Sequence, residues 1–242
     1  MAMNIIDKII AKKNDVFGAE PITIAFFGDS VTQGCFELYK TAPRGAQTEF
    51  RVEDGYHTKL RSILQMLYPS VPINMIHAGI SGDNAERGFG RIKRDVSVYK
   101  PDLTIVGFGL NDCCKGMEFL ETYKNSLKGI FDELKAIGSE IIFLTPCLPA
   151  YEVSAEVTDD FVREFYDSMI SVSNVTVDTF IDAARAVCAE AGVKVCDCFA
   201  IWKTLREKEV DTIRLLANRI NHPTADMHWL FAFMLIKEMF EL

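Results

Sequence analysis

The sequence predicts an α/β protein built on a doubly wound parallel sheet. Short apolar runs of strand length alternate along the chain with stretches in which apolar residues recur at helical spacing. With 49% hydrophobic and 25% charged residues, the composition is that of a globular protein, not of a disordered or collagen-like one. The 242 residues contain no Ser/Gly linker and no internal repeat. We therefore expect one domain over residues 1–242, with a core from about 22 to 240 and an N-terminal helix from about 3 to 16.

Five apolar runs are the predicted strands. The first, residues 22–27, is apolar throughout and ends at Gly28, which is typical of a strand buried on both faces. Similar runs follow at residues 73–77, 103–108, 140–145 and 193–198. Helical faces are predicted between and after these runs, within residues 60–67, 123–134, 177–188 and 225–242.

Charge and cysteine usage exclude several classes of protein. The chain has 26 basic and 34 acidic residues, a net charge of −8, which argues against nucleic acid as a partner. No stretch approaches the roughly 18 consecutive apolar residues that a membrane span needs, and the N-terminus lacks an apolar segment of signal-peptide length. The seven cysteines include no C-x-x-C pair and several lie in apolar runs. We therefore expect reduced thiols, no metal site and a cytoplasmic location.

Ligands of an open parallel sheet bind beyond the carboxyl ends of its strands. Directly after the first run comes the block GDSVTQG, residues 28–34, which contains Ser30. A serine at such a junction is exposed beside backbone N–H groups that stabilise negative charge, so the position suits a nucleophile. The alternative is that Ser30 caps a helix and that Gly28 allows a tight turn.

Three further blocks follow the same pattern. Gly79 and Gly82 of the block HAGISGDN let the backbone approach a ligand closely after the second run. Asn111 of GFGLND follows the third run, where its amide would lie over the same strand ends as Ser30 and suit a developing oxyanion. His222 of NRINHP precedes the last helix and is the candidate base, with a structural loop role as the alternative.

In this order and spacing, the four blocks resemble the SGNH hydrolases, also called the GDSL lipase, acylhydrolase and esterase family. The resemblance runs over residues 22 to about 240. It implies a flavodoxin-like three-layer α/β/α sandwich with a five-stranded parallel sheet. It also implies that Ser30 is the nucleophile and His222 the base, and that the oxyanion hole consists of the N–H groups of Ser30 and Gly82 and the side-chain amide of Asn111. Neither a cofactor nor a metal is implied.

The sequence departs from the family at the third member of the catalytic triad. The family usually carries D-x-x-H-P, and this chain has Arg219 where the Asp would be. Because the imidazole still needs a hydrogen-bond acceptor at Nδ1, we expect a neutral orienter, either the side chain of Asn218 or Asn221 or a backbone carbonyl near Arg219. Asp226 and His228 form a second acid and histidine pair, which we expect to lie within the last helix in a structural role.

The sequence thus predicts a serine esterase that forms an acyl-enzyme on Ser30 and cleaves a small-molecule ester of a short-chain acyl group or an acetylated sugar. One alternative is a catalytically impaired relative that binds carbohydrate or acyl groups. Another is a flavodoxin-like module that holds FMN or another phosphate in residues 28–34, a loop that lacks lysine and dense Ser/Thr. No motif in the sequence identifies the exact substrate or the oligomeric state.

Two long loops are expected, over residues 35–54 and 146–159. Aromatic and basic residues of the first loop either border the substrate pocket or pack the loop onto the body of the protein; they are Phe36, Tyr39, Arg44, Phe50 and Arg51.

Overall fold

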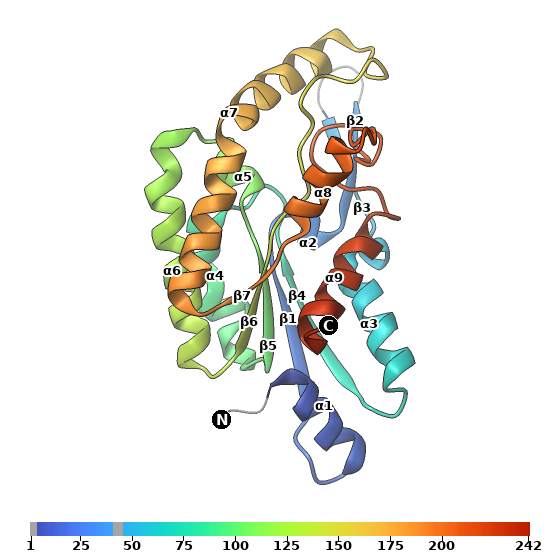
Figure 1. Cartoon of the computed structure of the whole chain (residues 1–242), viewed down its shortest axis with the longest axis vertical. Helices are drawn as coiled ribbons and strands as arrows, with labels where there is room; N and C mark the ends of the chain where they lie inside the picture. The colour runs from blue at the N-terminus through green and yellow to red at the C-terminus, as the bar shows by residue number, and fades with distance from the viewer. Residues whose placement is uncertain (1–3, 41–45) are drawn as a thin grey trace.

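The computed structural model describes the backbone of residues 4–40 and 46–242 and the side chains of residues 4–36 and 49–242. At its centre lies a parallel sheet of five strands in the order β4-β1-β5-β6-β7 (Figure 1). The predicted five-stranded parallel sheet is confirmed. In chain order its strands are β1 Ile22–Gly28, β4 Ile73–Gly79, β5 Leu103–Gly107, β6 Glu140–Leu144 and β7 Lys194–Cys196.

Helices cover both faces of this sheet, which makes the fold the predicted three-layer sandwich. Helices α4, α6 and α7 pack together on one face, and α3 and α9 pack together on the other (Figure 1). Of the longer helices, α4 and α8 were not expected from the spacing of apolar residues. The longer helices are α1 Ile5–Asn14, α3 Tyr56–Leu67, α4 Ala85–Asp95, α6 Leu120–Ala136, α7 Asp160–Ala191, α8 Cys198–Glu207 and α9 His228–Phe240.

Strand β1 is anchored in both helix layers because its side chains alternate between the two faces. Phe26 packs edge-on against Tyr56 of α3, with ring centres 5.8 Å apart. Phe27 packs edge-on against Phe108 on the opposite face, with ring centres 5.2 Å apart. The ring of Phe108 in turn lies so close to α4 that a Cβ at Gly88 would be 2.6 Å from it. Burying each phenylalanine contributes about 2–3 kcal/mol.

Residues 35–54, expected to be a loop, form an antiparallel hairpin instead. Strand β2 (Cys35–Lys40) pairs with strand β3 (Ala46–Phe50), and a short 3-10 helix follows at Val52–Asp54. The residues between the two strands lie outside the described ranges. Charged residues on both strands conceal the alternation that would have indicated them. The other expected loop, residues 146–159, has no regular secondary structure, as predicted.

Helix α7 is 32 residues long, and the sequence indicated only its second half. Its first half carries exposed phenylalanines, Phe161 and Phe165, so the apolar residues there do not form a single buried face. The helix begins where Asp159 accepts the N–H of Val162 at 3.1 Å and ends at Gly192, which has a φ of +62°. Neither α7 nor any other helix in the described ranges is apolar enough over a sufficient length to cross a bilayer.

Candidate active site

The candidate site lies at the ends of β1, β4 and β5, where three glycines stand side by side. Gly28 pairs with Gly79 on one side and with Gly107 on the other. The one-turn helix α2 (Ser30–Gln33) follows β1 and lies directly over these positions. A Cβ at Gly79 would be 2.4 Å from the backbone nitrogen of Gln33, and a Cβ at Gly28 would be 2.5 Å from the carbonyl oxygen of Gly107. Only glycine lets α2 approach the strand ends this closely.

Ser30 is the first residue of α2 and is 5% exposed. Its position is fixed by Asp29, whose carboxylate accepts the N–H of Val31 at 3.0 Å and so caps the helix. At the other end Gly34 adopts a φ of +85° and turns the chain into β2. The Ser30 hydroxyl lies 2.9 Å from Nε2 of His222, which is hydrogen-bond distance between a nucleophile and its base.

His222 is presented by a tight loop that Asn218 organises. The side-chain oxygen of Asn218 accepts the backbone N–H groups of Ile220, Asn221 and His222 at 3.0, 2.9 and 2.9 Å. Its side-chain nitrogen donates to Oδ1 of Asn221 at 3.0 Å. Both asparagines were expected as orienters of the imidazole ring. In the structure Asn218 orients the backbone of the loop, and its amide is occupied by these contacts.

The Nδ1 atom of His222 faces sulfur. The Sγ atom of Cys35, the first residue of β2, lies 3.3 Å from Nδ1. Cys35 is fully buried, and it follows Gly34 at the end of the segment that carries Ser30. One short stretch of chain therefore contacts both nitrogens of the ring.

Arg219 occupies the position of the usual triad acid but points elsewhere. Its Nε donates to Oε2 of Glu156 at 2.7 Å, and its guanidinium also donates to the carbonyl oxygen of Leu216 at 2.5 Å. The residue has a φ of +59°, a conformation that side chains other than glycine seldom adopt. The arginine thus ties its loop to residues 146–159 and supplies no acceptor for the histidine.

The second acid and histidine pair, Asp226 and His228, lies at the start of helix α9. Helix α9 begins at His228, so Asp226 lies in the turn before it and not within the helix as expected. His228 is fully buried, and its Nδ1 accepts the N–H of Tyr56 at 2.9 Å. That N–H is the first of helix α3 and has no partner within the helix. Burial holds the pKa of His228 well below the usual value, so the ring is neutral and acts as a cap for α3.

Two of the expected oxyanion donors lie in the loops that follow β4 and β5, the strands on either side of β1. Gly82 follows β4 with a φ of +74°, and no atom lies within 4 Å of where its Cβ would be. Asn111 belongs to the short helix α5 (Leu110–Cys113), and its Nδ2 donates to the carbonyl oxygen of Asp83 at 2.8 Å. Because an amide nitrogen carries two hydrogens, one of them is left for an oxyanion.

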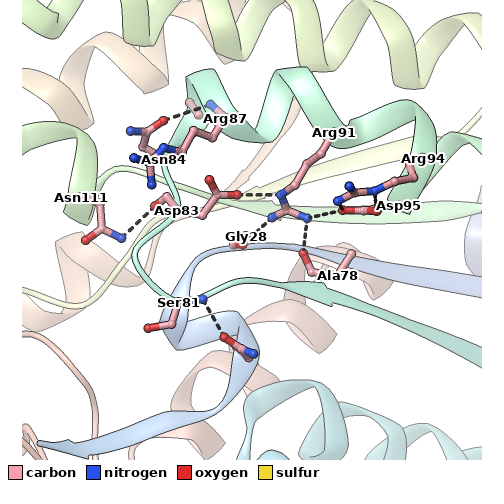
Figure 2. A network of polar contacts seen from close by, with 12 residues as sticks. Gly28, Ala78, Ser81, Asp83, Asn84, Arg87, Arg91, Arg94, Asp95 and Asn111 are labelled. Carbon is pink, nitrogen blue, oxygen red and sulfur yellow. Dashed lines mark hydrogen bonds and ion pairs between the residues drawn. The ribbon is translucent and has the colours of Figure 1, made fainter. Parts of the chain in front are cut away.

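The buried Arg91 holds the loop that contains Gly82 (Figure 2). Its Nε donates to the Asp83 carboxylate at 2.7 Å. The same guanidinium donates to the carbonyl oxygens of Ala78 at 2.9 Å and Gly28 at 3.0 Å, at the ends of β4 and β1. One cation of α4 thus fixes the relative positions of two strand ends and the loop between them.

Burial sets the protonation of the site. It lowers the pKa of the His222 imidazole to about 4, so the ring is neutral at pH 7 and its Nε2 can accept a proton. Burial also raises the pKa of the Asp29 and Asp112 carboxyls to about 7, against the opposing effect of the backbone N–H groups that they accept. The described residues include no cluster of three or more His, Cys, Asp or Glu side chains placed to hold a metal ion.

The aromatic and basic residues of the hairpin were expected either to border the substrate pocket or to pack this segment onto the body of the protein. Phe36 is fully buried and packs against His228, with ring centres 4.8 Å apart, and the Arg51 guanidinium lies 4.8 Å from the centre of the Phe36 ring. These two residues therefore pack the hairpin onto the body. Phe50 is exposed, and the side chains of Tyr39 and Arg44 lie outside the described ones.

Cys35 and Arg91 were missed by sequence reasoning. Cys35 adjoins the GDSVTQG block, and a search for any side chain able to accept a hydrogen bond near that block would have found it. Arg91 gives no such signal, because it lies among other charged residues of a helix that the apolar spacing did not indicate.

Residues 26–230 match the profile of the GDSL-like lipase/acylhydrolase family. The chain belongs to this family. The four blocks that position Ser30, Gly82, Asn111 and His222 all lie within the matched region.

Individual proteins also resemble the chain. An acetylxylan esterase of Geobacillus stearothermophilus is 27% identical over 132 residues, which cover 51% of this chain and 58% of that enzyme. A crystal structure of an acetylxylan esterase of that organism superposes with a TM-score of 0.65 at 23% identity, covering 90% of this chain and 94% of the other. A two-domain esterase active on acetylated mannans superposes with a TM-score of 0.69 at 16% identity, covering 98% of this chain and 52% of that one.

Substituting Gly79 tests the close approach of α2. We expect Gly79→Ala to lower the free energy of unfolding by about 1–3 kcal/mol, because the new methyl group would overlap the backbone of α2. Gly90→Ala in α4 is the matched control, since no atom lies within 4 Å of its Cβ and alanine favours a helix by up to about 1 kcal/mol. Denaturant unfolding measures both changes, and equal stability of the two variants would contradict the packing described.

Substituting Arg91 tests the anchoring of the oxyanion loop. Arg91→Met leaves the Asp83 carboxylate buried without its cation, so we expect a loss of about 3–5 kcal/mol in unfolding free energy. Arg94→Met, on the same helix but exposed, removes a cation that pairs only with the neighbouring Asp95 and should leave the unfolding midpoint unchanged. If Arg91→Met unfolded at the wild-type denaturant concentration, Arg91 would not be the anchor.

Proposed function

We propose that this protein is a serine esterase that removes short acyl groups, acetyl above all, from esters of sugars. The observation that carries the proposal is the 2.9 Å contact between the Ser30 hydroxyl and Nε2 of a neutral, partly buried His222. A serine that only caps a helix would have no need of an imidazole on its hydroxyl. Membership of the GDSL-like lipase/acylhydrolase family supports the same reaction class.

The reaction proceeds in two steps. In the first, Nε2 of His222 takes the Ser30 proton while the oxygen attacks the ester carbonyl. The resulting oxyanion is held by the N–H groups of Ser30 and Gly82 and by the second amide hydrogen of Asn111. The imidazolium then gives its proton to the departing alcohol, which leaves the acyl group on Ser30. In the second step His222 takes a proton from a water molecule that attacks the acyl carbonyl, and the imidazolium returns this proton to the Ser30 oxygen as the acid leaves.

Acetylated sugars are the proposed substrate class because of the relatives. An acetylxylan esterase is similar in sequence over half of this chain, and an esterase active on acetylated mannans shares the fold over nearly all of it. The sugar, the length of the chain and the position of the acetyl group are left for a substrate panel to determine.

The alternatives, a binding module and an impaired relative, are less well supported. An FMN or phosphate site in residues 28–34 would call for unpaired positive charge, whereas Arg91, the cation that reaches Gly28, is paired with Asp83 and Asp95. An impaired relative would show a serine separated from its base, whereas the two are in contact here. A fluorophosphonate probe that labels Ser30 in the folded protein would distinguish an esterase from both.

We also propose a reducing, intracellular location. None of the seven cysteines forms a disulfide in the described part of the chain, and six of them are buried. Cys196 and Cys198, whose sulfur atoms are 4.0 Å apart, remain unbridged. Such thiols persist where glutathione keeps them reduced.

Ser30→Ala tests the nucleophile. We expect the variant to lose essentially all turnover of p-nitrophenyl acetate and of acetylated xylo-oligosaccharides, with less than about a tenth of wild-type kcat remaining on the best ester. Its melting temperature should stay within a few degrees of wild type because the hydroxyl contributes little packing. Ser62→Ala, which removes an exposed hydroxyl from α3, is the control and should keep full activity. Substantial turnover by Ser30→Ala would exclude a covalent mechanism on this residue.

Asn111→Ala tests the oxyanion hole. We expect kcat to fall roughly 100-fold or more with little change in KM, because the amide meets a charge that exists only in the transition state. Asn174→Ala is the control, since this exposed amide donates to the Tyr151 carbonyl oxygen at 2.9 Å and lies outside the proposed site. A higher KM with unchanged kcat would instead make Asn111 a residue that binds the ground state.

A further inference from the structure

A catalytic histidine needs a group at Nδ1 that selects its tautomer. The neutral ring carries one proton, and only the form protonated on Nδ1 leaves Nε2 free to accept the proton of a serine. Without an acceptor at Nδ1, the ring can place its proton on Nε2 and donate to Ser30, which blocks the reaction. The identity of the Nδ1 partner therefore bears directly on activity.

The two asparagine side chains expected at Nδ1 make other hydrogen bonds, and the residue at the position of the usual triad acid is a cation. The side-chain oxygen of Asn221 accepts from the side-chain nitrogen of Asn218 at 3.0 Å. Arg219 is a cation that pairs with Glu156 at 2.7 Å. The side-chain oxygen of Asn218 accepts three backbone N–H groups. Of the side chains that the structure describes, the one in contact with Nδ1 is Cys35, at 3.3 Å, a normal distance for a hydrogen bond to sulfur.

The placement of Cys35 is enforced by the fold. The residue begins β2 directly after Gly34, whose φ of +85° turns the chain back from α2, and its Cα pairs with Phe50 across the hairpin. Its side chain is fully buried. Sulfur and imidazole are therefore held together by backbone constraints on both sides.

We propose that Cys35 is the positioning residue of His222, with Sγ accepting the Nδ1–H in the place that a carboxylate takes in the family's usual triad. The inference rests on the proposed esterase function. Cys35 touches neither substrate nor the reacting atoms and acts only through the ring.

The exchange of carboxylate for sulfur has a chemical consequence. A neutral sulfur accepts a hydrogen bond weakly and carries no charge to stabilise the imidazolium that forms when Ser30 is deprotonated. The tautomer is thus selected, but the transition state gains less than from a carboxylate. The His222 ring also interacts electrostatically with His228 of α9, and burial lowers the pKa of His228 and keeps it neutral.

Three variants and a control test the proposal with p-nitrophenyl acetate as substrate. Cys35→Ala removes the acceptor and should lower kcat about tenfold or more while KM changes less than about twofold. Cys35→Ser restores an acceptor and should recover part of that loss. Cys35→Asp supplies the missing charge and should match or exceed wild-type kcat. Cys188→Ala, which removes a buried thiol of α7, is the control and should leave both constants unchanged.

The pH profile separates this role from simple packing. In wild type, burial lowers the pKa of His222 to about 4. A carboxylate at Nδ1 favours the charged imidazole, so Cys35→Asp should move the acidic limb of kcat/KM to higher pH than in wild type. Cys35→Ala and Cys35→Ser should leave the limb close to its wild-type position. An unchanged limb in a folded, active Cys35→Asp would contradict contact between residue 35 and the ring.

Several results would overturn the proposal. One is wild-type kcat in Cys35→Ala; another is an equal loss in the Ala, Ser and Asp variants while their melting temperatures match wild type. Should Cys35→Asp fail to fold, the comparison of Ser with Ala and the 15N chemical shifts of His222 decide, since wild type must show the ring protonated on Nδ1. Absence of ester turnover in the folded wild-type protein would instead refute the esterase function itself, separately from the role of Cys35.

Discussion

A helix of one turn rests its backbone on the ends of neighbouring strands, and a methyl group at Gly28 or Gly79 beneath it would overlap neighbouring atoms. This close contact, together with the cap that Asp29 provides, fixes the position of Ser30 at the start of α2. The turn at Gly34 then sends the chain into the hairpin with its first side chain already beside the histidine. The arrangement of nucleophile, base and thiol follows from this one steric constraint.

The oxyanion loop is held by charge instead of by steric fit. Arg91 reaches from α4 to the Asp83 carboxylate and to two strand-end carbonyl oxygens, so the helix layer on that face is bonded to the catalytic edge. Because these groups are buried away from water, each contact is stronger than it would be at the surface. Removing one partner therefore lowers the free energy of unfolding by more than it would at the surface. The same dryness keeps His222 uncharged and raises the pKa values of the carboxyls of Asp29 and Asp112.

The sequence predicted the strands because these depend on local signals, the continuous apolar runs. The pairing of Ser30 with His222 was implied by the resemblance of the four blocks to the GDSL family and not by local patterns. The sequence did not predict the hairpin, where charged residues conceal the strand pattern, or the first half of α7, whose phenylalanines are exposed. The contact of Cys35 with Nδ1 arises from two segments far apart in the chain, and no spacing rule links them. The neutral orienter expected from Asn218 illustrates the difficulty, since that side chain proved to be occupied in shaping its own loop.

Ser30 and His222 are 192 residues apart in the chain. During synthesis the nucleophile, its cap and the strands beneath it are all complete long before the base exists. Long-range contacts of this kind form late, after the loop-closure cost between distant segments has been met. A nascent chain therefore carries Ser30 without its histidine until residue 222 has been made, and a polypeptide that ends before this residue lacks the Ser30–His222 contact.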